Sequence, residues 1–320
     1  MKHLSRLLKT VLPLSIGLLF IYLSYQSTTA EERHKIITSI QNADYRFVFL
    51  SVFFAILSHF SRAYRWQYLL NPLGYQPRLI NSLFTVMVAY LANLGIPRSG
   101  EILRATALSN YEKFTFEKVF GTVVAERAID LLLLLSFIAL SLFLQFELIW
   151  QLLGLDQFNP LYLLVLGLIA LFTFLLLRRL VWQSQHLFAL KIKKIISGFY
   201  EGIATLKTME KKGWFIAHTL FIWIMYLAMF YVIKWALPDT HNMTWAMVIP
   251  AFVAGGLAIS ATNGGIGIYP YTVALVLGSF GITQETGLAF GWIMWSSQTL
   301  MIVVFGAISF FALPLVNSKS

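Results

Sequence analysis

Long apolar runs separated by short polar segments dominate this chain. The runs fall at about 7–25, 47–60, 79–96, 128–146, 161–177, 214–236, 245–262 and 287–313, with a shorter one at 270–282. A helix needs roughly 20 residues to cross a bilayer, and helices satisfy their own backbone hydrogen bonds in lipid. The pattern therefore predicts an all-α, polytopic integral membrane helix bundle of about 7–9 hydrophobic segments, folded as a single transmembrane domain over 1–320.

Composition supports a membrane protein and narrows its chemistry. The chain is 58% hydrophobic and 12% charged, and it contains no cysteine, which excludes disulfides and thiolate metal sites. The net charge of +10 comes from lysines and arginines gathered in short inter-helix segments, as orientation signals are, so no nucleic-acid partner is expected. No HExxH, GxSxG or nucleotide-binding loop occurs, so we expect no catalytic site, metal or cofactor.

The distribution of basic residues predicts the orientation. Lys2, Arg6 and Lys9 predict a cytoplasmic N-terminus, and the basic segment 178–213 should be cytoplasmic too. The N-terminus and the segment 178–213 can both be cytoplasmic only if 79–120 enters and leaves the membrane on the cytoplasmic side. This segment is then either a re-entrant hairpin or a pair of crossings.

Two breaks interrupt the apolar pattern, one in each half of the chain. Pro97 removes a backbone donor and disfavours helix at Ile96, and glycines after Ala261 allow positive φ and close backbone approach. The residues expected at these backbone breaks are Pro97, Gly100, Asn263, Gly264, Gly265, Gly267 and Pro270. Interrupted segments in corresponding halves are typical of an inverted-repeat transporter with its site between the breaks.

Charged side chains accompany the first break and the run that follows it. Glu126 and Asp130 share a helix face, and Arg127 can pair with Asp130 at i,i+3. We place these three residues at the start of a helix, at the membrane boundary. They form either an internally neutralised anchor or a site in which Arg127 binds a lipid phosphate and a carboxylate takes an amine or a proton.

Arg98, Glu101 and Arg104 repeat that spacing just after the first break. If a helix begins near Ser99, with Ser99 as its N-cap, the three charges form one stripe beside a helix N-terminus that attracts anions such as phosphate.

Other polar residues lie within the apolar runs themselves. Arg62 and Arg65 beside Trp66 are interpreted first as snorkelling interface anchors, with contact to a cytoplasmic headgroup as the alternative. His59 and His218 fall singly in apolar runs and are interpreted as hydrogen-bonded core histidines rather than metal ligands.

These motifs, in this order, resemble the flippase-like membrane region of lysylphosphatidylglycerol synthases, a family that also occurs as stand-alone proteins. The resemblance covers nearly the whole chain. It rests on Arg62 to Trp66, Asn93, Pro97-Arg98-x-Gly100-Glu101-x-x-Arg104, Glu126-Arg127-x-x-Asp130 and Gly264-Gly265-Ile266-Gly267.

The resemblance implies a lipid translocase that binds phosphate-headgroup lipids, either aminoacyl-phospholipids or polyprenyl-linked lipids. The implied substrate-binding residues are Asn93, Arg98, Glu101, Arg104, Glu126, Arg127 and Asp130, with Arg62 and Arg65. A separate lipid-modifying enzyme is a candidate protein partner. The synthase's aminoacyl-transfer domain has no counterpart here, so synthase activity is not expected.

The second break departs from the family pattern. Ala261-Thr262-Asn263 stands where the family often has prolines, and Tyr269-Pro270 follows where it often has an acidic residue, so we assign no coupling carboxylate there. Two alternatives stay open beside the translocase: a non-transporting scaffold or accessory subunit, and an intramembrane subunit of a lipid-modifying enzyme.

Overall fold

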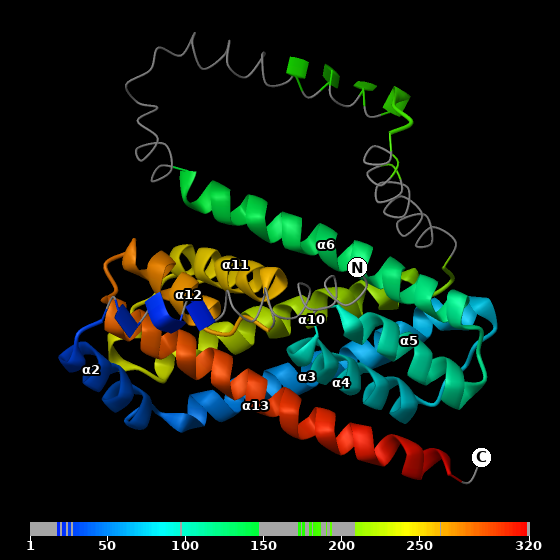
Figure 1. The fold of residues 1–320 in the computed structure, drawn as a ribbon, viewed down its shortest axis with the longest axis horizontal. Coiled ribbons are helices and arrows are strands. Elements are labelled where there is room, and N and C mark those ends of the chain that lie inside the picture. Colours follow the sequence, from blue (N-terminus) through cyan, green and yellow to red (C-terminus); the bar gives the residue numbers. More distant parts are fainter. Residues whose placement is uncertain are drawn as a thin grey trace, which may run out of the picture. The chain divides into compact units, whose positions relative to one another are not determined.

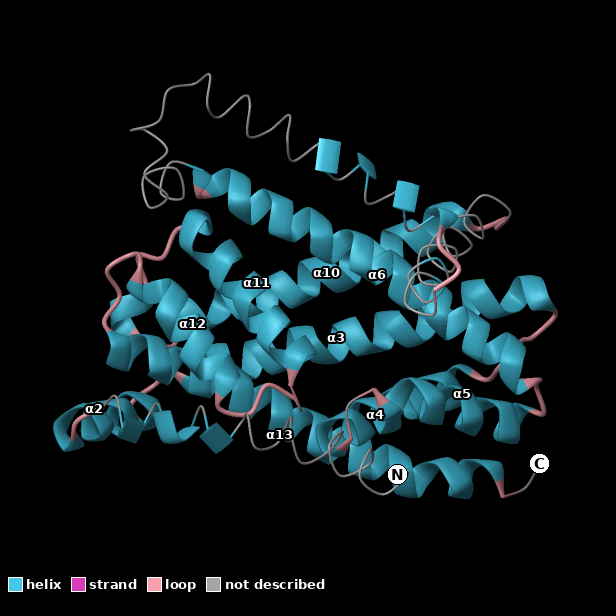
Figure 2. Cartoon of the chain, turned by 45° about the horizontal axis from the view of Figure 1, so that its top comes forward, coloured by secondary structure: helices cyan, strands magenta, loops and turns pink. Residues whose placement is uncertain are grey.

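The computed structural model describes residues 18–146 apart from 20, 24, 27 and 97, scattered positions between 172 and 193, and 209–318 apart from 263. Throughout these residues the chain forms helices and loops and no strand (Figure 2). The all-α membrane bundle is therefore confirmed. The runs predicted at 7–25 and 161–177, and the basic segment 178–213, fall mostly outside the described residues.

Within the described residues, four helical spans are long and apolar enough to cross a membrane. They comprise α3 (Tyr45–Leu70), α6 (Phe116–Leu144), α10 (Lys212–Val232, continued by η3, Ile233–Trp235) and α13 (Gln284–Asn317). The chain divides into two compact units, one formed by Met1–Val123 with Met209–Ser320 and the other by Val124–Thr208. All of these helices except most of α6 belong to the first unit.

Helices α3 and α10 pack side by side and run in opposite directions. At the start of α3 the Asp44 amide donates to Ala236 O, just beyond α10, over 2.9 Å. Towards the other end, Arg65 Nη1 of α3 donates to Thr219 Oγ1, in the first half of α10, over 3.0 Å. The segment after α3 therefore starts at one end of the unit, and the segment after α10 starts at the other.

A helical hairpin follows α3 and the short 3-10 helix η1 (Asn71–Leu73). Its arms are α4 (Leu79–Gly95, 17 residues) and α5 (Ser99–Glu112, 14 residues), and we call it hairpin 1. Glu112 Oε1 closes the open end, accepting from the Arg78 amide over 2.9 Å and from Asn81 Nδ2 over 2.7 Å. Both arms are shorter than the roughly 20 residues of a full crossing, which favours the re-entrant hairpin over two crossings.

The first break lies where the sequence places it. Helix α4 ends at Gly95, and Arg98 adopts a left-handed conformation with φ 60° before α5 begins. Pro97 itself is outside the described residues. The prediction that Gly100 belongs to the break is wrong, because Gly100 is the second residue of α5 and its backbone is helical.

A second helical hairpin comes after α10. Its arms are α11 (Trp245–Ala261) and α12 (Ile268–Gly278), and we call it hairpin 2. Gly264, Gly265 and Gly267 have φ of 63°, 76° and 69°, so the predicted glycine break is confirmed. Asn263 is outside the described residues. Pro270 was wrongly assigned to the break: it is the third residue of α12, in the first turn, where a missing N–H removes no helix hydrogen bond.

The two hairpins open at opposite ends of the first unit (Figure 1). Hairpin 1 opens beside the end of α13, where Asn81 and Asn317 exchange amide hydrogen bonds of 2.9 and 2.8 Å. Hairpin 2 opens at the other end, which is marked by the 3.2 Å bond from Thr286 Oγ1 to Asp239 Oδ2. We call these the Asn81 end and the Asp239 end.

The tips of the hairpins touch between those ends. A Cβ placed on Gly264, in hairpin 2, would lie 2.8 Å from Leu94 Cδ2, near the tip of hairpin 1. Trp295 Nε1 of α13 donates to Gly264 O over 2.6 Å and holds this contact against the long helix. Two hairpins that enter from opposite ends and meet at their breaks agree with the inverted arrangement expected from the sequence.

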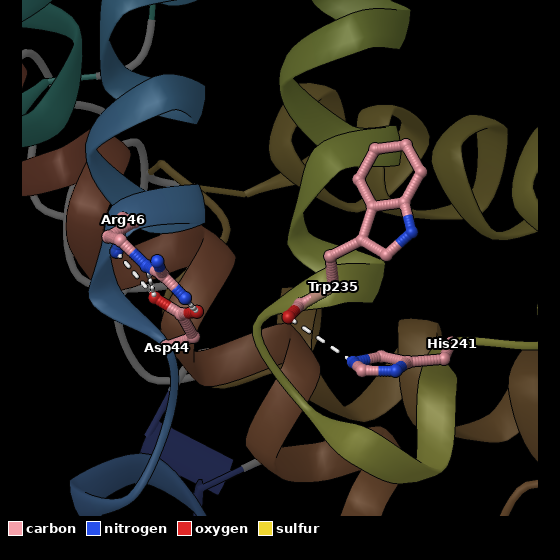
Figure 3. Close-up of polar contacts among 4 residues, drawn as sticks. All are labelled: Asp44, Arg46, Trp235 and His241. Atoms are coloured by element: carbon pink, nitrogen blue, oxygen red, sulfur yellow. Dashed lines mark hydrogen bonds and ion pairs between the residues drawn. The ribbon is translucent and has the colours of Figure 1, made fainter.

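Side chains at the Asp239 end fasten the loops there (Figure 3). Asp44 caps α3 and forms an exposed ion pair of 2.6 Å with Arg46, while His241 Nε2 lies 3.3 Å from Trp235 O. The Arg46 guanidinium lowers the pKa of the Asp44 carboxyl. The small stability gained from this pair is therefore present above the carboxyl's ordinary pKa and is lost as the pH falls through the lowered value.

Helix α2 (Ala30–Gln41) was not predicted. Thr29 accepts from the Glu32 amide, and the Glu32 carboxylate accepts from the Thr29 amide. The Thr-x-x-Glu spacing of this capping box was present in the sequence and could have identified the start of the helix.

The Asn81 end and the Asp239 end should face opposite sides of the membrane, and this topology can be tested. The chain has no cysteine, so single cysteines can be introduced directly. With a cytoplasmic N-terminus, Glu117→Cys at the exposed start of α6 should react only from the cytoplasmic side, and His241→Cys only from outside. Labelling of intact and opened cells with a membrane-impermeant maleimide measures this. Reaction of both cysteines from one side would contradict the arrangement.

Candidate functional site

Three arginines are buried in the first unit. Arg62, Arg65 and Arg104 expose 2%, 0% and 2% of their surface. The interpretation of Arg62 and Arg65 as snorkelling anchors is wrong, because snorkelling needs a charged group that reaches water. Both side chains lie on the face of α3 that meets α10. The structure therefore brings together residues that lie in separate motifs of the sequence.

Helix α10 orients the two arginines of α3. Arg65 Nη1 donates to Thr219 Oγ1 over 3.0 Å, and its Cζ lies 5.3 Å from the centroid of the Phe215 ring. Arg62 Nη2 donates to the Tyr226 hydroxyl over 3.1 Å. A hydroxyl from α10 thus fixes the direction of each guanidinium group.

Arg104 reaches the same region from hairpin 1. Its guanidinium carbon lies 3.7 Å from the centroid of the Trp66 ring, within the range of a cation–π interaction. The Trp66 indole donates to Thr122 Oγ1 over 2.8 Å. Trp66 therefore joins hairpin 1 to α3 and to the first turns of α6.

The first turn of α5 differs from the prediction. The N-cap position is Arg98 rather than Ser99, and Ser99 Oγ donates to Ile96 O over 2.8 Å and to Ala92 O over 3.2 Å, at the end of α4. The N-cap assignment of Ser99 is therefore wrong. Arg98 is exposed outside the helix, Glu101 is half-buried and Arg104 is buried, so the three charges do not form one stripe.

Asn93 has a structural role that the sequence did not reveal. Its Oδ1 accepts from the buried Gly100 amide over 2.8 Å, so a side chain of α4 satisfies the N-terminus of α5. We expect Asn93→Ala to reduce the free energy of unfolding by about 1–3 kcal/mol, since it leaves that amide unpaired. Asn93→Asp, which keeps an acceptor, should lose less. Equal stability of Asn93→Ala and wild type in denaturant unfolding would contradict this role.

The remaining predicted residues belong to the second unit. Helix α6 begins at Phe116, so Glu126 lies ten residues, roughly 15 Å, along it. The prediction that this group opens a helix at the membrane boundary is wrong. Arg127 Nη1 lies 4.0 Å from Asp130 Oδ2, which confirms the predicted i,i+3 pair. Glu126 and Asp130 are buried, with exposures of 0% and 8%.

Metal binding has no visible basis in the described parts of the chain. No three histidine, aspartate or glutamate side chains gather there in a way that could hold an ion. The chemistry of the buried arginine cluster is instead that of an anion site, because guanidinium groups bind phosphate and carboxylate through paired N–H donors.

The sequence of this chain matches a known family of membrane proteins. The family described as lysylphosphatidylglycerol synthase TM region matches residues 10–306, nearly the whole chain. The protein belongs to this family. The resemblance inferred from the sequence motifs is therefore confirmed.

Another similar protein lies in an archaeon. The present chain is 25% identical over 297 residues to a UPF0104 membrane protein of Methanocaldococcus jannaschii. The match covers 85% of the present chain and 78% of that relative. No solved structure matches. Family and apolar helices together establish a multi-pass membrane protein.

Proposed function

We propose that this protein is a lipid translocase that binds lipids through a phosphate in their headgroup. The observation that carries the proposal is the burial of Arg62, Arg65 and Arg104 inside a membrane helix bundle. Ionisable groups at such positions are expensive, and they generally mark a substrate pathway. Glu101, in the same unit, remains a candidate for this pathway. Glu126, Arg127 and Asp130, in the second unit, remain candidate lipid-binding residues on the sequence motif alone.

Phosphate suits these arginines better than a neutral ligand. A guanidinium group presents its N–H donors in a planar fork that matches two phosphate oxygens. Thr219, Tyr226 and the Trp66 ring orient the three groups before a lipid arrives, which reduces the entropy lost on binding.

The hairpins supply a means of moving the lipid. Their tips meet at Leu94 and Gly264, and tilting one hairpin against the other would open the region between them towards one end of the bundle at a time. The sequence has no nucleotide-binding motif, so the driving force would come from an ion gradient, the membrane potential or the lipid gradient. Acyl chains would stay in the surrounding lipid.

The proposal includes a location and a substrate range. The protein would lie in the cytoplasmic membrane with its N-terminus inside, and its substrates would be aminoacyl-phospholipids or polyprenyl-linked lipids. A separate lipid-modifying enzyme would supply them.

Reconstituted vesicles test the proposal. Vesicles that contain wild-type protein are compared with protein-free vesicles. Each carries labelled aminoacyl-phosphatidylglycerol, phosphatidylglycerol or polyprenyl phosphate, and movement of the label between leaflets is measured under an imposed ion gradient or potential. Movement of one lipid, recovered chemically unchanged, supports a translocase. Conversion of the lipid would instead indicate an enzyme. No movement of any lipid under any gradient would overturn the proposal and favour a scaffold.

A further inference from the structure

His59 occupies an unusual position next to the arginine cluster. It lies on α3 one turn before Arg62, exposes 6% of its surface and packs edge-on against Tyr90, with 4.5 Å between ring centroids. Over the described part of the chain, its buried Nδ1 has no hydrogen-bond partner. The expectation of a hydrogen-bonded core histidine therefore fails at this atom, and an unsatisfied buried polar atom calls for an explanation.

Hydrogen bonds and ring contacts connect His59 to the proposed phosphate site. Tyr90, whose ring meets His59, has its hydroxyl 3.2 Å from the Tyr226 hydroxyl, and Tyr226 accepts from Arg62 Nη2 over 3.1 Å. These residues come from α3, from hairpin 1 and from α10. We call His59, Arg62, Tyr90 and Tyr226 the His59 cluster. Protonation of His59 would therefore add a positive charge next to Arg62, which would hold the lipid phosphate.

We propose that His59 takes up a proton when a lipid phosphate binds at Arg62 and releases it when the phosphate leaves, so that a proton accompanies the lipid. This inference rests on the proposed function. The proton passes from water to Nδ1 and forms an imidazolium, and the reverse transfer accompanies release of the phosphate. No covalent bond of the lipid forms or breaks.

Electrostatic interactions determine that phosphate binding and protonation of His59 favour each other. Without an anion, an imidazolium one turn from Arg62 would place two positive charges together in a buried site, which is unfavourable. A bound phosphate offsets that repulsion and so favours protonation. By linkage, protonation of His59 must tighten phosphate binding by the same factor.

Several charged and titratable residues lie on the helices that surround His59. The neighbouring elements carry Arg62 and Arg65 on α3, Arg104 on α5, Tyr90 on α4 and Tyr226 on α10. Arginine ordinarily keeps its charge near neutral pH, and tyrosine is ordinarily neutral there. Helix α13, which packs against α3 and α4, has no titratable side chain between residues 286 and 317. Histidine is the side chain whose charge ordinarily changes between pH 5 and 8.

Two further groups complete the surroundings and supply a control. Glu101 on α5 is half-buried, and His218 on α10 lies 2.8 Å from Ser61 Oγ through its Nδ1 and stacks on Tyr64. His218 is thus a second histidine of the same helix pair, with a hydrogen-bond partner and with rings other than those of the His59 cluster.

The experiment counts protons during lipid binding. Dihexanoyl-phosphatidylglycerol is titrated calorimetrically into detergent-solubilised full-length protein, in two buffers of different ionisation enthalpy, between pH 5.5 and 8. Wild type should take up as much as about one proton per lipid, and its affinity should rise by up to about tenfold per pH unit as the pH falls. His59→Gln should lose both effects, and His218→Gln should keep them.

The outcomes separate this inference from the function on which it rests. Lipid binding by wild type without proton uptake would overturn the proton coupling and leave the translocase proposal intact. Loss of uptake in His218→Gln but not in His59→Gln would also overturn it. Absence of dihexanoyl-phosphatidylglycerol binding would overturn the binding of a phospholipid phosphate at Arg62, and the proton coupling with it, while the vesicle assay with the other lipids would still test the translocase proposal. If His59→Gln fails to fold, absence of proton uptake by wild type would still overturn the inference, and uptake that persists in His218→Gln would support it.

Discussion

Replacing Arg65 and Arg104 together with alanine is expected to weaken binding of a phosphate-headgroup lipid by about 100-fold or more. Each arginine would make charge-assisted hydrogen bonds to the phosphate, worth about 1.5–3 kcal/mol apiece, and 1.4 kcal/mol corresponds to a factor of ten. Because both groups are buried, water cannot screen what is lost. Titration of dihexanoyl-phosphatidylglycerol into purified protein measures the change.

Arg46→Ala is the matched control. Arg46 lies on α3, as Arg65 does, but its side chain is 87% exposed and paired with Asp44 (Figure 3). Its removal should change the affinity by no more than about twofold, because exposed ion pairs contribute little. Arg65→Lys, which keeps the charge but not the planar fork, should be intermediate. Equal loss in Arg46→Ala and in the double variant would show that net charge, rather than the buried cluster, attracts the lipid.

Gly100→Ala is expected to destabilise the protein by at least about 3 kcal/mol, beyond the ordinary range for an overpacked core position. A Cβ at this position would overlap Ala89 O and lie 2.8 Å from Ala89 C. These are backbone atoms of the facing arm, so relief requires α4 and α5 to separate. Hairpin 1 would then no longer hold Arg104 against Trp66. Denaturant unfolding and the yield of monodisperse protein measure the effect.

Gly95→Ala provides the control within the same hairpin. A Cβ there meets nothing within 4 Å, and Gly95 is the last residue of α4. Alanine should therefore be neutral or stabilising by about 0.5–1 kcal/mol, because glycine loses more conformational freedom on folding. If Gly100→Ala were as stable as Gly95→Ala, the close contact between the two arms would be contradicted.

Local chemistry explains which features could be predicted from the sequence. The break before Arg98 depends on Pro97, and the second break depends on glycines that adopt positive φ, so each is encoded within a few residues. Long apolar runs located α3 and α13 in the same way. The start of α6 was missed because Glu117 and Lys118 interrupt the apolar pattern, although both are exposed within the first turn and are compatible with helix there.

Burial of particular arginines could not be predicted, because it depends on residues distant in the chain. Arg62 and Arg65 are enclosed by Tyr226 and Thr219, which are 164 and 154 residues away. Arg98 and Arg104 flank the same motif, yet the left-handed turn at Arg98 leaves it outside the helix while Arg104 reaches Trp66. No local spacing distinguishes these two outcomes.

The most direct test of a buried-arginine lipid pathway is the rate of lipid movement in vesicles. Wild type, the Arg65/Arg104 double alanine variant and Arg46→Ala would be reconstituted at equal density, with the labelled lipid that wild type moves. A pathway through the buried arginines predicts movement by wild type and Arg46→Ala, and a rate in the double variant no higher than in protein-free vesicles. Undiminished movement by a folded double variant would contradict it.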